Sequence, residues 1–197
     1  KKGRAGETQR VETTAGLVVG QRRDKRMYTV RLNDITKFAQ DVTAKIDGKT
    51  VQCDYLELGD PGLPHAVVLL EGDCAMTQEA LRELGRKLRA NSAFPKGANV
   101  NFCRVIGENE VEELTYERGV EDFTLACGTG TGSVVAALMR RGLVSGENTK
   151  VHVPGGELFI TLNIDPQTQE ITDIYLTGPT NIVAEGEVCD EELHVLL

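Results

Sequence analysis

Strand-like segments outnumber helical ones along this chain, and this imbalance constrains the fold more than any other feature of the sequence. Helical patterns occur at 77–90 and 129–142, and each lies between segments rich in Val, Ile and Thr. Helices flanked by strands along the chain favour sheets that wrap around helices. The sequence therefore predicts an α+β fold in which residues from about 26 to 180 form a curved sheet around a central helix at 129–142.

The two helical segments carry different end signals. In the first, Leu81, Leu84 and Leu88 recur at spacings of three and four, and Thr77 precedes them as an N-cap. The second is capped by Thr129 or Thr131 and closed by Gly142. Residues 34–49 are ambiguous between helix and strand. Strands are expected at 10–19, 26–32, 51–58, 65–71, 98–106 and 110–117, and further strand patterns lie within 150–188.

Composition excludes several classes of protein. The 197 residues, 40% of them hydrophobic, suffice for one large or two small domains. A net charge of -8 argues against a nucleic-acid or anionic-membrane surface, and no apolar run reaches the ~20 residues of a membrane helix. Five cysteines without a CxxC pair indicate reduced thiols in a cytoplasm, with no zinc site. Four lie in or beside strand patterns and are expected to be core residues: Cys53, Cys74, Cys103 and Cys189.

The fifth cysteine, Cys127, lies in TLACGTGTG (124–132), where the second helix begins. The unpaired N–H groups and positive dipole of a helix start favour a thiolate and attract an anion such as a carboxylate. A phosphate loop is disfavoured because the pattern GxxxxGK[ST] is absent. A cysteine protease would need a histidine partner, and the three histidines leave that reading open.

This stretch also carries a resemblance to a known family. YERG (116–119) followed by TLACGTGTG resembles the second signature of the diaminopimelate epimerases. Further similar segments follow the family's order along nearly the whole chain: ETTAG (12–16), LPHAVV (63–68), FPKGANVNF (94–102), VPGGELFI (153–160) and LTGPTNIVAEGEV (176–188).

The resemblance implies a cofactor-free proton transfer between L,L- and meso-diaminopimelate, in lysine and cell-wall synthesis. Cys127 would be one of two acid/base thiols on opposite faces of the substrate, without pyridoxal phosphate or metal. Gly128 and Thr129 would bind the α-carboxylate, and Glu117 the α-ammonium. Arg118 and Asn99 would bind the distal end, and His65 would orient the thiols.

The resemblance also implies a fold and a domain division. The chain would be a diaminopimelate epimerase-like half, a curved, mostly antiparallel sheet around its central helix. Residues 1–25 would end a first domain that is mostly missing, and 26–197 would form the second, its last strand returning to the first. No second cysteine lies in a glycine-rich helix start. We therefore expect a partner half, on the same or a separate polypeptide; a homodimer is left open.

Two alternatives to this function stay open. Leu63 stands where the family has an asparagine, so a racemase of a different amino acid is the first. The spacing from Glu117 to Cys127 is also one residue longer than usual in the family. The second alternative is a non-catalytic domain that binds a carboxylate and lacks its partner half.

Overall fold

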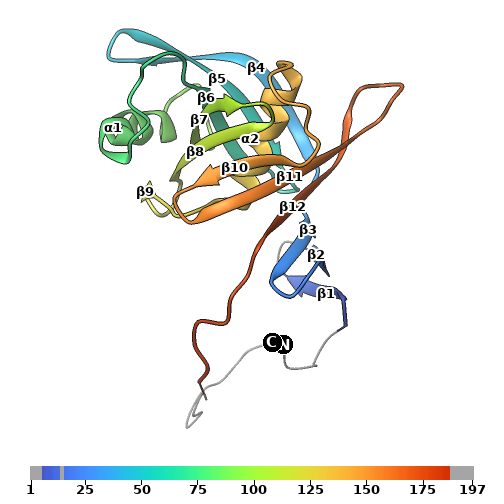
Figure 1. Ribbon diagram of the computed structural model, residues 1–197. Helices are drawn as coiled ribbons and strands as arrows, with labels where there is room; N and C mark the ends of the chain where they lie inside the picture. Colours follow the sequence, from blue (N-terminus) through green and yellow to red (C-terminus); the bar gives the residue numbers. More distant parts are fainter. Residues whose placement is uncertain (1–5, 14–15, 187–197) are drawn as a thin grey trace.

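The computed structural model describes residues 6–13 and 16–186. Both predicted helices form, as α1 (Gln78–Arg89) and α2 (Gly128–Arg140), and the rest is dominated by strands (Figure 1). The strands are β1 (Thr8–Thr13), β2 (Gly16–Arg22), β3 (Met27–Arg31), β4 (Ile35–Ile46), β5 (Lys49–Leu58), β6 (Leu63–Leu69), β7 (Asn99–Gly107), β8 (Glu110–Glu117), β9 (Asp122–Phe123), β10 (Thr149–Val153), β11 (Gly156–Ile164) and β12 (Ile171–Pro179). The expected mixed, sheet-dominated α+β fold is therefore present.

The described strands form one sheet in the order β1-β2-β3-β12-β11-β10-β8-β7-β6-β5-β4, with β9 paired to β8. Two neighbouring pairs, β6–β7 and β8–β10, are parallel, and the other neighbouring pairs of described strands are antiparallel. Parallel neighbours need a long crossover connection, usually a helix. Helix α1 lies in the crossover from β6 to β7, and α2 in the crossover from β8 to β10.

Helix α2 lies inside the curve of the sheet. Its residues from Gly130 to Leu138 are buried, and it contacts β5, β6 and β7 on one side and β11 and β12 on another. Strands from both parts of the sheet order thus pack on one helix, which requires the sheet to bend around it. Leu56, Val67 and Ile160 belong to the core on this face.

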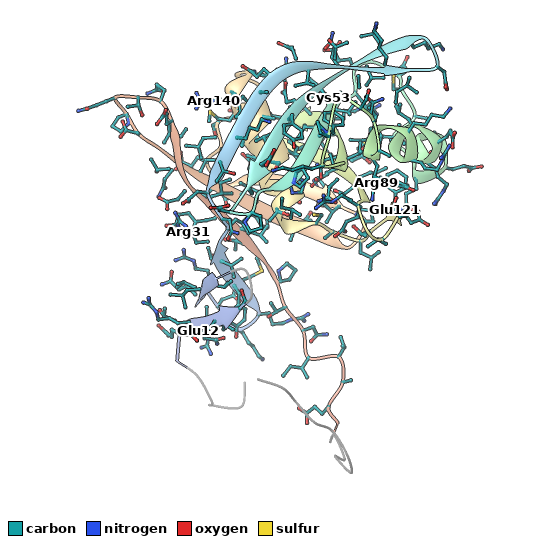
Figure 2. The ribbon with its side chains drawn as sticks, turned by 180° about the vertical axis from the view of Figure 1, so that it is seen from behind. Glu12, Arg31, Cys53, Arg89, Glu121 and Arg140 are labelled. Carbon is teal, nitrogen blue, oxygen red and sulfur yellow. The ribbon has the colours of Figure 1, made fainter. Side chains whose placement is uncertain are left out.

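Helix α1 covers the opposite face of β7 and β8 (Figure 1). Its buried Leu81 and Leu88 join Tyr55 and Phe102 in a second core, as the three- and four-residue spacing predicts. The outer face of α1 is charged, and Arg89 pairs with Glu121 at 2.7 Å. Figure 2 labels both residues in a view from behind. Strands β5–β8 therefore separate two cores, one under each helix.

The amino-terminal part departs from the prediction. The expected single strand at 10–19 is instead a hairpin of β1 and β2, with Thr13 opposite Gly16. Gly16 has a φ of 98°, which an L-residue rarely adopts and which breaks the extended run. The hairpin projects from the body of the molecule, with Glu12 at its side (Figure 2). It is joined to the sheet through β3, which pairs with β12.

Two further segments differ from the sequence-based expectation. Residues 34–49, which were ambiguous between helix and strand, contain the long strand β4, whose register shifts between Ala39 and Val42. A strand was expected within 181–188, but 181–186 are exposed and form no strand; residues 187 and 188 lie outside the described part. Val183 is 89% exposed, because among the described residues no strand pairs with this segment.

Candidate active site

Cys127 is the N-cap of α2. Its φ of -131° and ψ of 104° are extended, and the helix begins at the next residue, Gly128. Neither Thr129 nor Thr131 is therefore the cap, because both lie within the first turn. At the other end Arg141 is the C-cap, and Gly142, predicted there, follows with a φ of 71°. The prediction of a thiol at a helix start is confirmed, and the cap lies two residues before Thr129 and four before Thr131.

The protonation state of Cys127 differs from the expectation. Its side chain is 8% exposed, and burial raises the pKa of the thiol to about 11. The Gly130 N–H and the Thr129 hydroxyl lower this pKa, whereas the nearby Glu117 charge raises it. The predicted thiolate is wrong for the chain as described, because desolvation outweighs the helix start.

Asn99 and Arg118 meet where β7 begins and β8 ends. The Asn99 side chain is 3% exposed, and its Oδ1 accepts the Arg118 N–H at 2.8 Å. The Arg118 guanidinium donates to the carbonyl of Lys96 at 2.7 Å. Glu117 precedes Arg118 and is half-buried; its charge reaches Cys127. The structure therefore brings these predicted residues to one end of the sheet, beside the start of α2.

The segment that follows Glu117 forms a short hairpin. Glu117 pairs with Asp122 and Tyr116 with Phe123, which makes β9 a return strand of β8. Gly119 and Glu121 have positive φ angles of 91° and 61° in this turn. This segment thus forms a closed turn, and Glu117 stays within electrostatic reach of the thiol.

His65 reaches the site through a threonine. Its ring is completely buried on β6, and Nε2 lies 3.1 Å from Thr129 Oγ1. Thr129 Oγ1 in turn lies 3.7 Å from Cys127 Sγ. Burial, assisted by the Arg118 charge, lowers the pKa of His65 to about 3, so the ring is neutral. Among the contacts of the described residues, His65 is linked to the thiol through Thr129.

Sequence reasoning missed a set of buried polar residues behind His65. Asn101, Glu113, Thr115 and Thr131 are each 3% exposed or less. A signal was present: Asn101 alternates with Asn99, and Thr115 with Glu113, and an apolar residue separates the members of each pair. Alternating polar residues in a buried strand indicate a polar cluster on one face.

The other cysteines divide between core and surface. Cys53 and Cys103 are buried as predicted, and burial raises both thiol pKa values, that of Cys53 to about 12. Cys74 is exposed, so its assignment to the core is wrong; it lies in a connection before α1 rather than in a strand. Cys189 lies outside the described residues. Cys127 is thus buried, but at a helix start.

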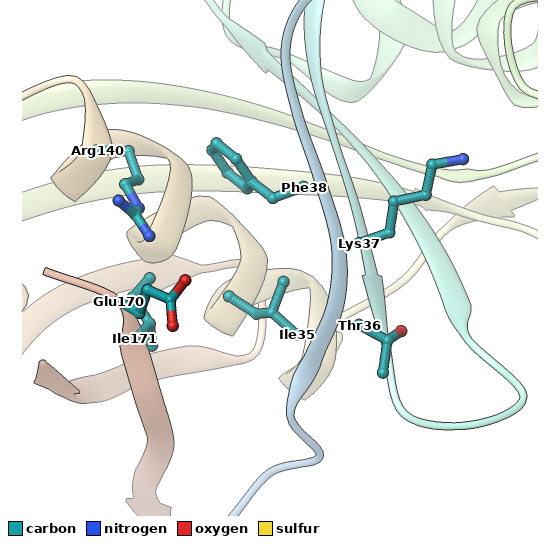
Figure 3. A pocket seen from close by; sticks show the side chains of 7 residues that line it. All are labelled: Ile35, Thr36, Lys37, Phe38, Arg140, Glu170 and Ile171. Atoms are coloured by element: carbon teal, nitrogen blue, oxygen red, sulfur yellow. The ribbon is translucent and has the colours of Figure 1, made fainter. Parts of the chain in front are cut away.

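A pocket of about 260 Å³ lies at the far end of α2, lined by Ile35, Thr36, Lys37, Phe38, Arg140, Glu170 and Ile171 (Figure 3). Arg140 lies over the Phe38 ring, 6.0 Å from its centre. At about 1.5 Å per residue, Arg140 is roughly 20 Å along the helix from Cys127. None of the predicted site residues lines this pocket.

Two findings concern other classes of site. Across 6–13 and 16–186, no three or more His, Cys, Asp or Glu side chains gather so as to hold a metal ion. Neither helix in that part of the chain is long and apolar enough to cross a membrane.

Comparisons with known proteins agree with the cysteine motif and the fold. A sequence model of diaminopimelate epimerase matches residues 59–183. The diaminopimelate epimerase of Methanothrix thermoacetophila is 35% identical, over 98% of this chain and 67% of its own length. The chain belongs to the diaminopimelate epimerase family. This is a family of isomerases, and the matched segment contains every residue that the resemblance assigned to the site.

A second relative and a solved structure extend the comparison. The diaminopimelate epimerase of Aquifex aeolicus is 33% identical, over 98% of this chain and 66% of its own length. The chain thus spans about two thirds of the length of these curated epimerase relatives. A phenazine biosynthesis protein of the PhzF family from Enterococcus faecalis has a similar fold, with a TM-score of 0.56 at 13% identity, over 94% of this chain and 66% of that one.

Proposed function

We propose that this chain carries one half of a cofactor-independent amino-acid epimerase site, which interconverts L,L- and meso-diaminopimelate. The observation that carries the proposal is Cys127 as N-cap of α2, with the N–H groups of the first turn beside its thiol. The first N–H groups of a helix have no intrahelical acceptor and favour an anion. An α-carboxylate bound by Gly128 and Thr129 would hold the α-carbon against Cys127.

The protonation state of Cys127 indicates whether it donates or removes a proton in this reaction. A thiol with a pKa of about 11 is neutral near pH 7. Cys127 therefore acts as the acid when the α-hydrogen of the substrate faces the partner half. A base on the partner half breaks the Cα–H bond, and Cys127 delivers its own proton to the opposite face of the carbon. The resulting thiolate is stabilised by the Gly130 N–H and Thr129 hydroxyl, and the reverse reaction uses it as the base.

The remaining site residues bind the two ends of the substrate. Glu117 accepts from the α-ammonium, and the Arg118 guanidinium binds the distal carboxylate. The bond from the Arg118 N–H to Asn99 Oδ1 supports this arrangement, because it fixes the backbone that carries the guanidinium. Asn99 contributes to the distal end as well, and His65 orients the thiol through Thr129.

The second cysteine belongs to another half. In this proposal residues 1–25 complete a first domain, residues 26–197 form the second, and the final segment returns to the first. The exposed hairpin β1–β2 and the exposed Val183 support this division, because both leave apolar side chains for a partner to cover. The partner half supplies the opposing thiol, on the same or a separate polypeptide.

One observation favours a different amino acid as substrate. Leu63, half-buried at the start of β6, stands where the family has an asparagine. An apolar side chain there cannot hydrogen-bond a distal carboxylate or ammonium. A racemase of an amino acid with a less polar distal end is therefore the second candidate function.

The test is α-proton exchange in heavy water, followed by NMR, with the complete two-half protein and no added pyridoxal phosphate or metal. L,L-Diaminopimelate should exchange, and Cys127→Ala should slow exchange by about a thousandfold, because one obligatory acid/base group is lost. Cys74→Ala, the same change at an exposed cysteine, serves as the control and should exchange normally.

Two results would change the proposal. Exchange at the normal rate by Cys127→Ala would overturn the mechanism. Exchange confined to amino acids without a distal carboxylate would retain the mechanism and favour the racemase. Arg118→Ala should raise KM for diaminopimelate more than it lowers kcat, because it removes a group that binds substrate away from the reacting carbon.

A further inference from the structure

A buried hydrogen-bonded network connects a carboxyl group to the thiol of Cys127. Its members, which we call the Glu113 network, are in order Glu113, Thr115, Asn101, His65, Thr129 and Cys127. They come from β8, β7, β6 and the first turn of α2, and Thr131 closes the network from the helix side. Within the described residues, no cation forms an ion pair with Glu113.

The orientation of the Asn101 amide is fixed by its surroundings. Its Nδ2 lies 3.4 Å from two carbonyl oxygens, those of Ala66 and Asn99, which only a donor can satisfy. The same Nδ2 lies 3.3 Å from His65 Nδ1. Because Nδ2 is the donor, His65 Nδ1 must be the acceptor and carries no hydrogen. The neutral ring therefore carries its hydrogen on Nε2.

This tautomer sets the direction of the last two bonds. His65 Nε2 donates to Thr129 Oγ1 across 3.1 Å. The hydrogen of the Thr129 hydroxyl must then point elsewhere, and Cys127 Sγ lies 3.7 Å away. Each hydrogen from Asn101 onward thus points toward the sulfur, an arrangement that favours the thiolate over the thiol.

At the Glu113 end of the network, the contacts of the Thr115 hydroxyl need one more hydrogen than is present unless Glu113 is protonated. Thr115 Oγ1 lies 3.1 Å from Asn101 Oδ1 and 3.2 Å from Glu113 Oε1, but its hydroxyl has one hydrogen for two acceptors. With Glu113 ionised, one of these contacts joins two oxygens without a hydrogen. A proton on Oε1 removes the conflict: Glu113 donates to Thr115, and Thr115 donates to Asn101.

The second carboxyl oxygen agrees with this assignment. Thr131 Oγ1 lies 2.7 Å from Glu113 Oε2 and 3.0 Å from the Cys127 carbonyl, which already accepts the Thr131 N–H. The Thr131 hydroxyl is therefore free to donate to Oε2. If the proton lay on Oε2 instead, Thr115 would again face two acceptors. The neutral acid with its hydrogen on Oε1 is the one state that places a hydrogen in both contacts of Thr115 and in the contact between Thr131 and Oε2.

The charges around Glu113 are compatible with a neutral acid. The titratable groups that face it are the thiols of Cys103, opposite it on β7, and Cys127 at the start of α2. Asp54 on β5 lies beyond Cys103 and is paired with Arg141, and His65 on β6 is neutral. Burial raises the pKa of Glu113 to about 7, and the two threonine hydroxyls moderate this increase.

We propose that Glu113, as the neutral acid, and Asn101 are positioning residues for Cys127. Asn101 holds His65 in the Nε2–H tautomer, which directs the Thr129 hydroxyl toward the sulfur. Neutral Glu113 completes the bonds to Asn101 through Thr115. Ionisation of Glu113 turns the Thr115 hydroxyl away from Asn101 and places a negative charge near the thiol, so Cys127 becomes a weaker acid. The proposal rests on the proposed role of Cys127, but its test reads the thiol directly and requires no substrate.

The first test measures the rate of Cys127 alkylation against pH in the complete protein, with mass spectrometry to separate its peptide from those of the other cysteines. In the wild type the logarithm of the rate should rise with pH, flatten as Glu113 ionises, and rise again. Glu113→Gln, whose amide can donate to Thr115 and accept from Thr131, should show one continuous rise. Above pH 8.5 it should react about three- to tenfold faster than the wild type, and below pH 6 at the same rate.

The matched control is Glu112→Gln, the same change one residue away on the opposite face of β8. It should keep the wild-type profile. A wild-type profile without a flat region, or a flat region that persists in Glu113→Gln, would overturn the proposal. A failure of epimerase activity alone would leave these profiles intact, so the two proposals fail separately.

A second measurement uses the wild-type protein alone, so it is valid even if Glu113→Gln does not fold. Nitrogen-15 NMR of the labelled histidines should find His65 neutral with its hydrogen on Nε2 between pH 6 and pH 9 (about the range in which the Glu113 carboxyl titrates). Its Nδ1 shift should move as Glu113 ionises. A hydrogen on Nδ1 would reverse the direction of the network and overturn the proposal.

Discussion

The two helices occupy opposite faces of the same strands, but their amino-terminal ends differ. The start of α1 is capped: Thr77 Oγ1 accepts the Ala80 N–H at 3.3 Å, and Glu79 lies in the first turn. The start of α2 has no acidic residue, and Cys127 makes no capping bond. A capped start is more stable, whereas an uncapped one keeps its N–H groups for a ligand. Helix α1 serves the fold, whereas the start of α2 is where we propose that the substrate binds.

The largest expected difference between the helices concerns one glycine in each. A Cβ on Gly130 would overlap Asn101 Oδ1, which is buried and held by the Glu113 network. Gly130→Ala should therefore destabilise the protein by about 3 kcal/mol, because either the helix or the network must move.

The matched change on α1 is Gly85→Ala, where a Cβ would lie 3.0 Å from the Tyr116 ring. The higher helix propensity of alanine stabilises the helix by about 1 kcal/mol, which offsets part of the crowding. The net change in the free energy of unfolding should therefore stay within about 1 kcal/mol. Urea denaturation measures both variants. Equal losses of stability would mean that the two helix interiors are equally constrained.

The second difference is the sign of the pH dependence. The raised pKa of Glu113, about 7, means that the folded state holds this proton while the unfolded chain loses it near pH 4.5. Stability due to this group is therefore present at low pH and is lost as pH rises from about 4.5 to 7. The free energy of unfolding of Glu113→Gln, relative to that of the wild type, should rise by about 2 kcal/mol between pH 5 and pH 8.

Glu83 on α1 should show the opposite sign. Its bonds to Arg86 and Lys87 lower the pKa to about 2, so its contribution is present above the unfolded pKa and is lost as pH falls. The side chain is exposed, and Glu83→Gln should change the profile little, and only below about pH 4.5. Thermal unfolding across pH compares the two variants. A gain in thermal stability of Glu83→Gln at high pH would contradict the lowered pKa of Glu83.

The smallest expected effects concern the caps. Thr77→Ala should lower the free energy of unfolding by about 1 kcal/mol, because the Ala80 N–H loses its acceptor. Cys127→Ser should gain about 0.5 kcal/mol, because serine supplies the missing capping oxygen at a residue whose φ and ψ already suit an N-cap. The same change should abolish epimerisation, since a hydroxyl is a far weaker acid than a thiol. Denaturation and exchange assays on one preparation test both statements.

The sequence predicted the fold where its pattern was local. The spacing of Leu81, Leu84 and Leu88 placed α1 within one residue, because an amphipathic period and a cap depend on neighbouring residues. The hairpin of β1 and β2 was missed because Val and Thr continue across the break at Gly16. The register shift in β4 made that strand unrecognisable, because a shift interrupts the period of two.

The candidate site was predictable where a motif carries it. The helix start at Cys127 and the Glu117–Arg118 pair are adjacent in sequence to glycine-rich turns, which mark them. The protonation of Cys127 was not predictable, because it depends on burial by distant strands. Glu113 was missed for the same reason: a glutamate in a strand is ordinarily a solvated residue, and here it is buried in the folded chain, where Thr131 of α2 donates to it.

The enclosure of α2 also has a consequence for the order in which the chain folds. Strands β11 and β12, which contact α2, follow it in sequence, and β12 must also pair with β3 near the amino terminus. Until nearly the whole described chain has been synthesised, the apolar surface of α2 lacks the cover that β11 and β12 provide. Contacts of such long sequence separation form slowly. In pulse-labelling hydrogen exchange during refolding, we expect the amides of α1 to become protected before those of α2.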